Sequence, residues 1–209
     1  MSFIVGIDGP AGTGKGTITN LVAKDLKLNQ IDTGAMYRAF TLYMLDNKVE
    51  LDEIEKIKEL LEKVKIDLIQ EDDKETVFLN GKDVTKEIRS KSVTNFVSPV
   101  SSIIEVRIKM VELQRKMAEG KNVIMEGRDI TTYVFPNANV KIYLDANVEE
   151  RAKRRYKENI EKGMQTTFEE VLQDMKKRDL EKAAGISHYT INKLNHGDNV
   201  TTDVLGKIC

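Results

Sequence analysis

The stretch GPAGTGKGT, Gly9 to Thr17, decides the fold class because of what stands on either side of it. Before it, FIVGI (Phe3 to Ile7) is a short continuous apolar run, as expected for a strand buried on both faces. After it, TITNLVAKDL (Thr17 to Leu26) carries apolar residues at helical spacing. A strand, a glycine loop and a helix in this order open a βαβ unit, so the sequence predicts an α/β protein with a parallel sheet flanked by helices.

The loop itself fits the pattern G-x-x-x-x-G-K from Gly9 to Lys15. Gly9, Gly12 and Gly14 allow the backbone to wrap closely around phosphate oxygens, with its N–H groups pointing inward. The following helix directs its positive N-terminal end at the same anion, and Lys15 adds a mobile positive charge. A chance glycine turn is the alternative, and the strand and helix on either side argue against it.

A small antiparallel insert is predicted at about residues 65–100. IDLIQ (Ile66 to Gln70) and TVFL (Thr76 to Leu79) alternate between apolar and polar residues like strands. Asn80-Gly81 is a strong two-residue hairpin signal. The insert therefore interrupts an otherwise α/β chain.

Beyond the insert, the pattern predicts one long helix and two strands. The helix covers 101–120, with Ser102 and Glu105 able to form a capping box at its start. NVIM (Asn122 to Met125) and VKIYL (Val140 to Leu144) are candidates for buried strands.

The composition excludes several classes of protein. A chain of 209 residues with 32% charged residues and a net charge of −1 gives no general reason to expect nucleic acid or an anionic membrane as partner. The single cysteine, Cys209, argues against a disulfide framework or a thiolate metal cluster. No run approaches the ~20 apolar residues of a membrane span, and the N-terminus does not resemble a signal peptide. We therefore expect a soluble cytoplasmic protein.

Gly16 stands where a phosphate loop usually carries Ser or Thr, whose hydroxyl reaches Mg²⁺. Glycine cannot supply that hydroxyl, and the next one belongs to Thr17. GKGT at this point resembles the nucleoside monophosphate kinases more than GTPases or motor ATPases.

Three later motifs extend the resemblance: IDTGAMYR (Ile31 to Arg38), EGRDI (Glu126 to Ile130) and VFPNANVKIYLDA (Val134 to Ala146). With the loop, and in this order, they resemble the bacterial cytidylate kinases from Phe3 to about Asp179. The resemblance implies the P-loop nucleoside monophosphate kinase fold over residues 1–179, with the insert in its monophosphate-binding part.

The resemblance also implies roles for particular residues. ATP would be held by the loop residues Gly9, Pro10, Ala11, Gly12, Thr13, Gly14, Lys15, Gly16 and Thr17. Substrate residues would be Thr33 at the sheet edge, Arg38 and Arg128 on the acceptor phosphate, and Ser98, Arg107 and Asp129 near the cytosine. Thr17 and Glu126 would orient Mg²⁺ through water or phosphate. For Glu126, a structural carboxylate that caps a neighbouring loop is the alternative.

RAKRRYK (Arg151 to Lys157) places five basic residues within seven. In the resembled family this position belongs to a mobile lid, here at about 151–165. Arg151, Arg154 and Arg155 would neutralise charge in the transition state, and with Lys15 and Arg128 they complete the candidate catalytic set. A solvated helical face is the ordinary alternative for such a run.

After KKRD (Lys176 to Asp179) the sequence departs from the kinase pattern. The family carries an Asp and an Arg at about Lys182 and Gly185, followed by a further strand and helix, whereas Arg178 remains as a candidate phosphate contact. Residues 180–209 instead resemble a fragment of a repressor-type helix-turn-helix domain. Three lysines against three acidic residues make a poor footprint for DNA, so we do not expect this tail to bind it.

We predict a monomeric enzyme that transfers a phosphoryl group from ATP to CMP or dCMP with Mg²⁺. The altered tail predicts weak activity or low stability relative to an intact family member. Two other functions stay open: a DNA-binding or regulatory protein whose kinase-like part senses nucleotide, and a kinase for another nucleoside monophosphate. The change of pattern near KKRD has two explanations that also stay open: a natural junction of two segments, or a frame or assembly error in the sequence.

Overall fold

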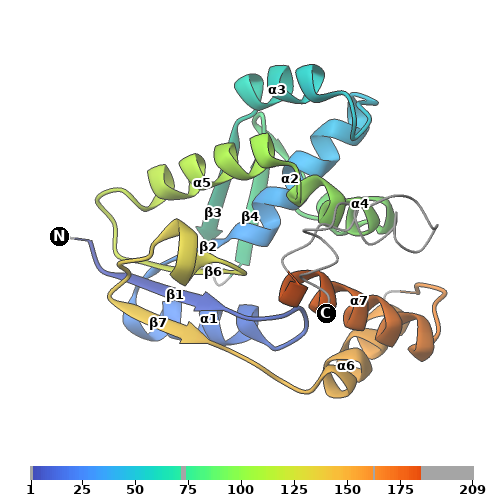
Figure 1. The fold of residues 1–209 in the computed structure, drawn as a ribbon. Coiled ribbons are helices and arrows are strands. Elements are labelled where there is room, and N and C mark those ends of the chain that lie inside the picture. The colour runs from blue at the N-terminus through green and yellow to red at the C-terminus, as the bar shows by residue number, and fades with distance from the viewer. Residues whose placement is uncertain (1, 72–73, 162, 185–209) are drawn as a thin grey trace. The chain divides into compact units, whose positions relative to one another are not determined.

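A computed structural model describes residues 2–71, 74–161 and 163–184 (Figure 1). These described residues divide into two compact units, one from 2–8 and 14–143, the other from 9–13 and 144–184. The first unit contains β1 (Ile4–Asp8), α1 (Lys15–Leu26), β2 (Asn29–Asp32), α2 (Thr33–Asp46), α3 (Ile54–Lys63), β3 (Ile66–Glu71), β4 (Lys74–Leu79), β5 (Lys82–Asp83), the 3₁₀ turn η1 (Glu87–Arg89), α4 (Lys91–Ser101), α5 (Ile104–Ala118), β6 (Val123–Gly127), the π-helical turn η2 (Ile130–Val134) and β7 (Val140–Tyr143). The second unit contains α6 (Val148–Glu161) and α7 (Phe168–Ala184).

The first unit is built on a parallel sheet in the order β2-β6-β1-β7, which confirms the predicted α/β class. Strand β6 pairs with β1 on one side and β2 on the other, and all five of its residues are buried. The register places Asp32 opposite Glu126 and Asp8 opposite Gly127, so three carboxylates reach the same edge of the sheet. That edge, at the carboxyl ends of parallel strands, is where α/β folds bind ligands.

Strand β7 corrects one prediction. VKIYL does form a strand, but the strand is not buried: Val140, Ile142 and Tyr143 are 38%, 40% and 60% exposed. Within the described part of the chain β7 pairs only with β1, so it forms an edge of the sheet. An apolar run marks a strand, but burial on both faces also requires neighbours, and these come from elsewhere in the chain.

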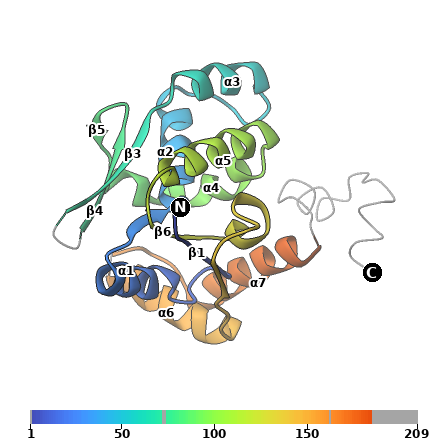
Figure 2. The same cartoon turned by 90° about the vertical axis from the view of Figure 1, so that its left-hand side faces the viewer.

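The predicted hairpin insert is confirmed as an antiparallel β3-β4-β5 sheet, which stands beside α2 in Figure 2. Asn80 and Gly81 both have left-handed backbone angles, with φ of 50° and 84°. Two successive positive φ angles are what a type I′ turn requires, and Asn-Gly supplies them at the lowest steric cost.

The helix predicted over 101–120 is interrupted near its start. Helix α4 ends at Ser101 and α5 begins at Ile104, and the residue at the N-cap of α5 is Ile103, which offers no side-chain cap. The Ser102 hydroxyl donates to the carbonyl of Ser98 at 3.1 Å. The predicted capping box is therefore wrong, because Ser102 serves the end of α4 rather than the start of α5.

Each unit has its own core. In the first, α2 buries Ala35, Met36, Ala39 and Phe40 completely, within one cluster that includes apolar residues of β6 and α5. In the second, Ala152 of α6 packs with Val171 and Met175 of α7, and Tyr156 meets Phe168 edge to face at 6.3 Å. The described helices include none long and apolar enough to span a bilayer.

Helix α7 runs without a break through the KKRD segment to Ala184. The start of the predicted helix-turn-helix fragment, residues 180–184, therefore continues the helix that precedes it. The predicted turn and second helix of that fragment lie outside the described residues.

Candidate functional site

The glycines of the loop adopt the backbone that the motif predicts. Gly9, Gly12 and Gly14 have φ of 154°, 76° and 88°, in the region that side chains disfavour. A Cβ built at Gly9 would lie 2.0 Å from the carbonyl oxygen of Leu144, which no side chain could tolerate. At Gly12 the nearest atom to such a Cβ would be Met175 Cε, at 3.2 Å.

Helix α1 begins directly after the loop. Gly14 occupies its N-cap position and has no side chain to satisfy the first N–H groups, which suits them to an anion. Lys15 is the first helical residue and is buried. The helix start therefore places backbone N–H groups beside a buried lysine, and the phosphate role of the loop stays a prediction.

Strand β2 and helix α2 hold Arg38 through Asp32. Asp32 caps the helix by accepting from the Ala35 N–H, and its second oxygen pairs with Arg38 Nη2, both at 2.9 Å. A Cβ at Gly34 would lie 3.0 Å from Asp32 Oδ1 and 3.1 Å from Arg38 Nη1, so glycine leaves room for this pair. Thr33 donates its hydroxyl to the carbonyl of Glu126 at 2.7 Å and thereby ties the ends of β2 and β6 together.

Glu126 lies at the centre of this edge and is only 9% exposed. Burial and the charge of Asp32 raise its pKa from 4.5 to about 7, although Lys15, Arg128 and Arg38 act in the opposite direction. Three cations, one at the start of α1, one directly after β6 and one on α2, therefore act on one carboxylate. A Cβ at Gly16 would approach Glu126 Oε1 to 3.3 Å, so the glycine also gives this carboxylate room.

Two of the three predicted cytosine residues contact each other. Arg107 of α5 forms an ion pair with Asp129, which follows β6. Burial raises the pKa of Tyr37 to about 12, with the Arg107 charge lowering it and the Asp129 charge raising it, so Tyr37 adjoins the pair. Ser98 lies on α4, where its carbonyl accepts from Ser101 and Ser102.

Sequence reasoning missed Asp8, which is buried at the end of β1. Its carboxylate accepts from the N–H groups of Ile130 and Thr131, both at 2.8 Å, and from the Thr131 hydroxyl at 2.6 Å. Asp8 thus fixes the turn that follows Arg128 and Asp129. The sequence did offer one signal for Asp8: it is an acidic residue placed between an apolar strand and the phosphate loop.

Glu75 of β4 was missed as well. Burial, together with the charges of Asp32 and Glu126, raises its pKa from 4.5 to about 7, although the Arg89 charge acts in the opposite direction. The hairpin insert therefore contributes a carboxylate near the same edge. The alternating pattern of β4 gave no signal for this position.

The second unit holds the remaining candidates. Arg155 pairs with Glu158 at 3.5 Å, and Arg178 pairs with Asp174 one turn earlier on α7 at 3.0 Å. Arg154 is exposed on α6. Arg151 differs from these because it is buried, with only 3% of its surface exposed.

A metal ion would have few protein ligands here. The described residues contain no group of three or more His, Cys, Asp or Glu arranged to hold one. Mg²⁺ is commonly held by one or two carboxylates together with substrate phosphates and water. A buried carboxylate whose pKa is raised, such as Glu126, fits a cation of that kind.

Comparison with known proteins gives a consistent result. The family model "Cytidylate kinase" matches residues 5–189, and a model of a Cro/C1-type HTH DNA-binding domain matches residues 172–209. The cytidylate kinase of Fusobacterium nucleatum is 50% identical over 85% of this chain and 80% of its own length, and that of Bacillus subtilis is 47% identical over 84% and 78%. The cytidylate kinase of Leuconostoc mesenteroides is 45% identical over 99% of this chain and 91% of its own.

Proposed function

Because this chain belongs to the cytidylate kinase family, we propose that it transfers the terminal phosphoryl group of ATP to CMP or dCMP. The observation that carries the proposal is the position of Glu126, which lies opposite Asp32 in the sheet and whose pKa the charges of Lys15, Arg128 and Arg38 all lower. These cations come from the donor loop and from both predicted acceptor contacts. The residues proposed for the donor and for the acceptor thus act on the same carboxylate at one edge of the sheet, which supports the proposal.

The reaction needs positioning and charge neutralisation more than proton transfer. An oxygen of the acceptor monophosphate is already anionic, so it attacks the terminal phosphorus of ATP in line without a general base. Lys15 holds the phosphates of ATP, and Arg38 and Arg128 orient the acceptor phosphate. Arg154, Arg155 and Arg178 are proposed to neutralise charge that develops during transfer.

Thr17 and Glu126 are the residues that would hold Mg²⁺, through phosphate or water. Bound there, the ion would supply charge neutralisation at the phosphates. The alternative for Glu126, a carboxylate with only a structural role, predicts that Glu126→Gln leaves the Mg²⁺ dependence of the rate unchanged. A rightward shift of the Mg²⁺ titration in that variant would favour the metal role.

Selection of cytosine is proposed to rest on Ser98, Arg107 and Asp129. A carboxylate accepts from the exocyclic amino group, and a guanidinium donates to the carbonyl edge. Uracil carries a carbonyl oxygen in place of the amino group, so it could not donate to Asp129 and would turn a second acceptor toward it, which makes binding of UMP unfavourable.

A coupled assay of ADP release over CMP, dCMP, UMP and AMP tests the proposal. CMP and dCMP should be the best acceptors, and Arg107→Met should raise KM for CMP by about tenfold or more, the effect of losing a charged hydrogen bond. Lys109→Met is a matched control on the same helix, since Lys109 pairs only with Glu112 one turn away in the described contacts. Faster turnover of AMP than of CMP would reject the cytosine assignment.

The match of residues 172–209 to a DNA-binding model supports a second candidate, a DNA-binding or regulatory protein. The balanced charge of residues 180–209 argues against it. Fluorescence anisotropy with labelled duplex DNA at physiological salt should show no binding. Saturable binding of one DNA sequence would establish the second candidate.

The altered tail leads us to propose weak activity, and we also propose a monomeric state. The rate constant kcat, measured beside that of the Bacillus subtilis relative, tests the first. Light scattering after size-exclusion chromatography tests the second.

A further inference from the structure

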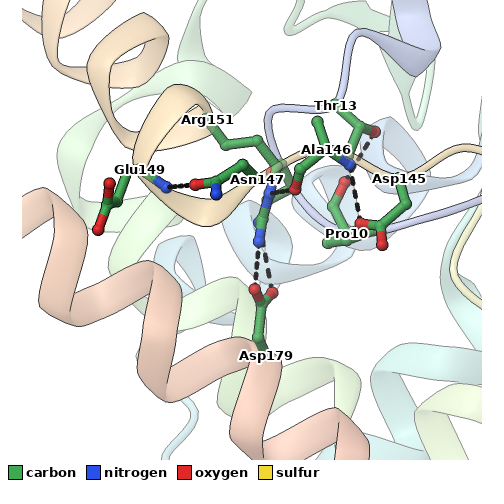
Figure 3. Close-up of polar contacts among 9 residues, drawn as sticks. Pro10, Thr13, Asp145, Ala146, Asn147, Glu149, Arg151 and Asp179 are labelled. Carbon is green, nitrogen blue, oxygen red and sulfur yellow. Dashed lines mark hydrogen bonds and ion pairs between the residues drawn. The ribbon is translucent and has the colours of Figure 1, made fainter.

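Arg151 is the buried member of the basic run on α6, and its guanidinium joins three separate segments (Figure 3). Nε donates to the carbonyl of Ala146 at 2.8 Å, just before α6. Nη1 donates to the carbonyl of Ala11 at 3.1 Å, within the phosphate loop. Nη1 and Nη2 both reach the carboxylate of Asp179 on α7.

The hydrogen bond from Arg151 to the Ala11 carbonyl fixes the direction of the next N–H group in the phosphate loop. In a trans peptide the C=O of one residue and the N–H of the next point in opposite directions. A carbonyl of Ala11 held toward Arg151 therefore turns the N–H of Gly12 away from Arg151. Phosphate loops need N–H groups that converge on the anion, with the carbonyls facing outward.

The preceding peptide is held in the same manner. The Thr13 hydroxyl donates to the carbonyl of Pro10 at 3.1 Å, which fixes the direction of the Ala11 N–H. Two successive peptide planes of the loop are thus set by side-chain donors, one from the loop itself and one from α6. The position of Gly12 fits this arrangement, because a Cβ there would lie 3.3 Å from Arg151 Cβ.

The carboxylate of Asp179 compensates the positive charge of the buried Arg151 guanidinium. Burying a guanidinium without a counter-charge costs much free energy, because the group loses its hydration. A carboxylate that accepts from two guanidinium nitrogens offsets that cost. Asp179 lies within residues 5–189, which the cytidylate kinase model matches, and it makes this contact with Arg151. Arg178, its neighbour, pairs within α7 instead.

We propose that Arg151, supported by Asp179, is a positioning residue that orients the phosphate loop for ATP, rather than a group that contacts the transferred phosphate. The inference rests on the proposed function, since it assumes that the loop binds ATP. Its consequence is specific: loss of either partner weakens ATP binding and leaves CMP binding intact. A residue that only touched the transition state would lower kcat and leave ATP affinity unchanged.

The test is a double-mutant cycle of Arg151→Met and Asp179→Asn, with the affinity for a non-hydrolysable ATP analogue and for CMP measured separately by calorimetry. Each single variant should weaken analogue binding by about tenfold, the effect of losing a charged hydrogen bond. The double variant should be no weaker than the poorer single one, because the two residues act as one unit. Affinity for CMP should change by less than about twofold, a margin within ordinary variation for sites that do not interact.

Lys153→Met is the matched control, because Lys153 is an exposed basic residue of the same helix that pairs with Glu150. It should leave analogue binding unchanged. Arg151→Lys should not restore binding, since a single ammonium cannot reach three segments as the planar fork does. If Arg151→Met does not fold, as judged by circular dichroism, Asp179→Asn alone decides the matter by its effect on analogue and CMP affinity.

Three outcomes would overturn the inference: unchanged analogue affinity with a reduced kcat, multiplicative effects in the double variant, or an equal loss of CMP affinity. Failure of the proposed function is distinguishable, because it concerns the acceptor. A wild-type protein that binds the ATP analogue but phosphorylates no CMP would reject the proposed reaction, and the cycle on analogue binding would still decide the role of Arg151.

Discussion

The first half of the phosphate loop, Gly9–Thr13, is fixed by atoms that pack against it, whereas the second half, Gly14–Thr17, is fixed by the start of α1. A Cβ built at Gly9 would lie 2.0 Å from the Leu144 carbonyl oxygen. A Cβ built at Gly14 would have no neighbouring atom within 4 Å. Both glycines have positive φ and both satisfy the same motif. Residues that are equivalent in a sequence pattern can thus be required for different physical reasons.

The largest effect is expected for Gly9→Ala. The new methyl would meet a backbone oxygen that cannot move alone, and alanine would also adopt a strained φ, which together should cost roughly 3–5 kcal/mol of unfolding free energy. Urea denaturation measures the loss. Gly81→Ala is the matched control, with φ of 84° and open space around it, and should cost far less. Equal losses of unfolding free energy in the two variants would mean that close packing around Gly9 adds nothing to the cost of its backbone conformation.

The second half of the loop adjoins Glu126, and the expected effect there depends on pH. The folded-state pKa of Glu126 is about 7 against an ordinary 4.5, so the folded state binds more protons between these values and loses stability as pH rises through them. Glu126→Gln removes this loss. Relative to wild type, the variant should gain on the order of 2 kcal/mol between pH 5 and pH 8.

Denaturant melts at both pH values measure this gain. Glu59→Gln is the control, on the exposed side of α3, and should show no such change. A Glu126→Gln variant whose stability relative to wild type is the same at pH 5 and pH 8 would contradict the raised pKa. The Glu126 charge also raises the pKa of Glu75, so Glu126→Gln should lower the Glu75 pKa and add to the gain in the same direction.

A smaller effect is expected for Gly14→Ala. With no neighbour to clash, the only cost is the left-handed backbone, about 1 kcal/mol for a residue with a Cβ. Gly14→Asn should cost less, because Asn adopts this conformation more readily. Thermal melts of the two variants test the order. A loss at Gly14 as large as that at Gly9 would show that the halves of the loop do not differ.

Local pattern predicted much of this molecule. The strand-loop-helix order, the Asn80-Gly81 turn and the α/β class are confirmed because each depends on residues close together in the chain. The exposure of β7 was not predictable in this way, since it depends on which strands stand next to it. The break between α4 and α5 was missed because Ser102 could serve either helix, and only tertiary packing decides between them.

The candidate site shows the same limit. Motifs made the loop, Arg38, Arg128 and Glu126 candidates because these residues lie in or close after recognisable strands, and their roles stay predictions. They did not reveal Asp8, whose role is to accept from Ile130 and Thr131, more than a hundred residues along the chain. Nor did they distinguish Arg151 from Arg154 and Arg155. One face of α6 is buried, and the spacing of the arginines alone does not show which of them lies on that face.

The smallest effect, and the finest test of the comparison, is expected for Gly16→Ala. Gly16 lies in the first turn of α1, so alanine should gain about 0.5–1 kcal/mol in helix propensity. Against this, its methyl would stand 3.3 Å from Glu126 Oε1 and remove further water from that carboxylate. The gain should therefore be seen at pH 5, where the carboxyl is protonated, and shrink at pH 8, where it is charged. In a Glu126→Gln background the same substitution should be equally favourable at both pH values, and a persistent pH dependence there would show that a group other than Glu126 governs this half of the loop.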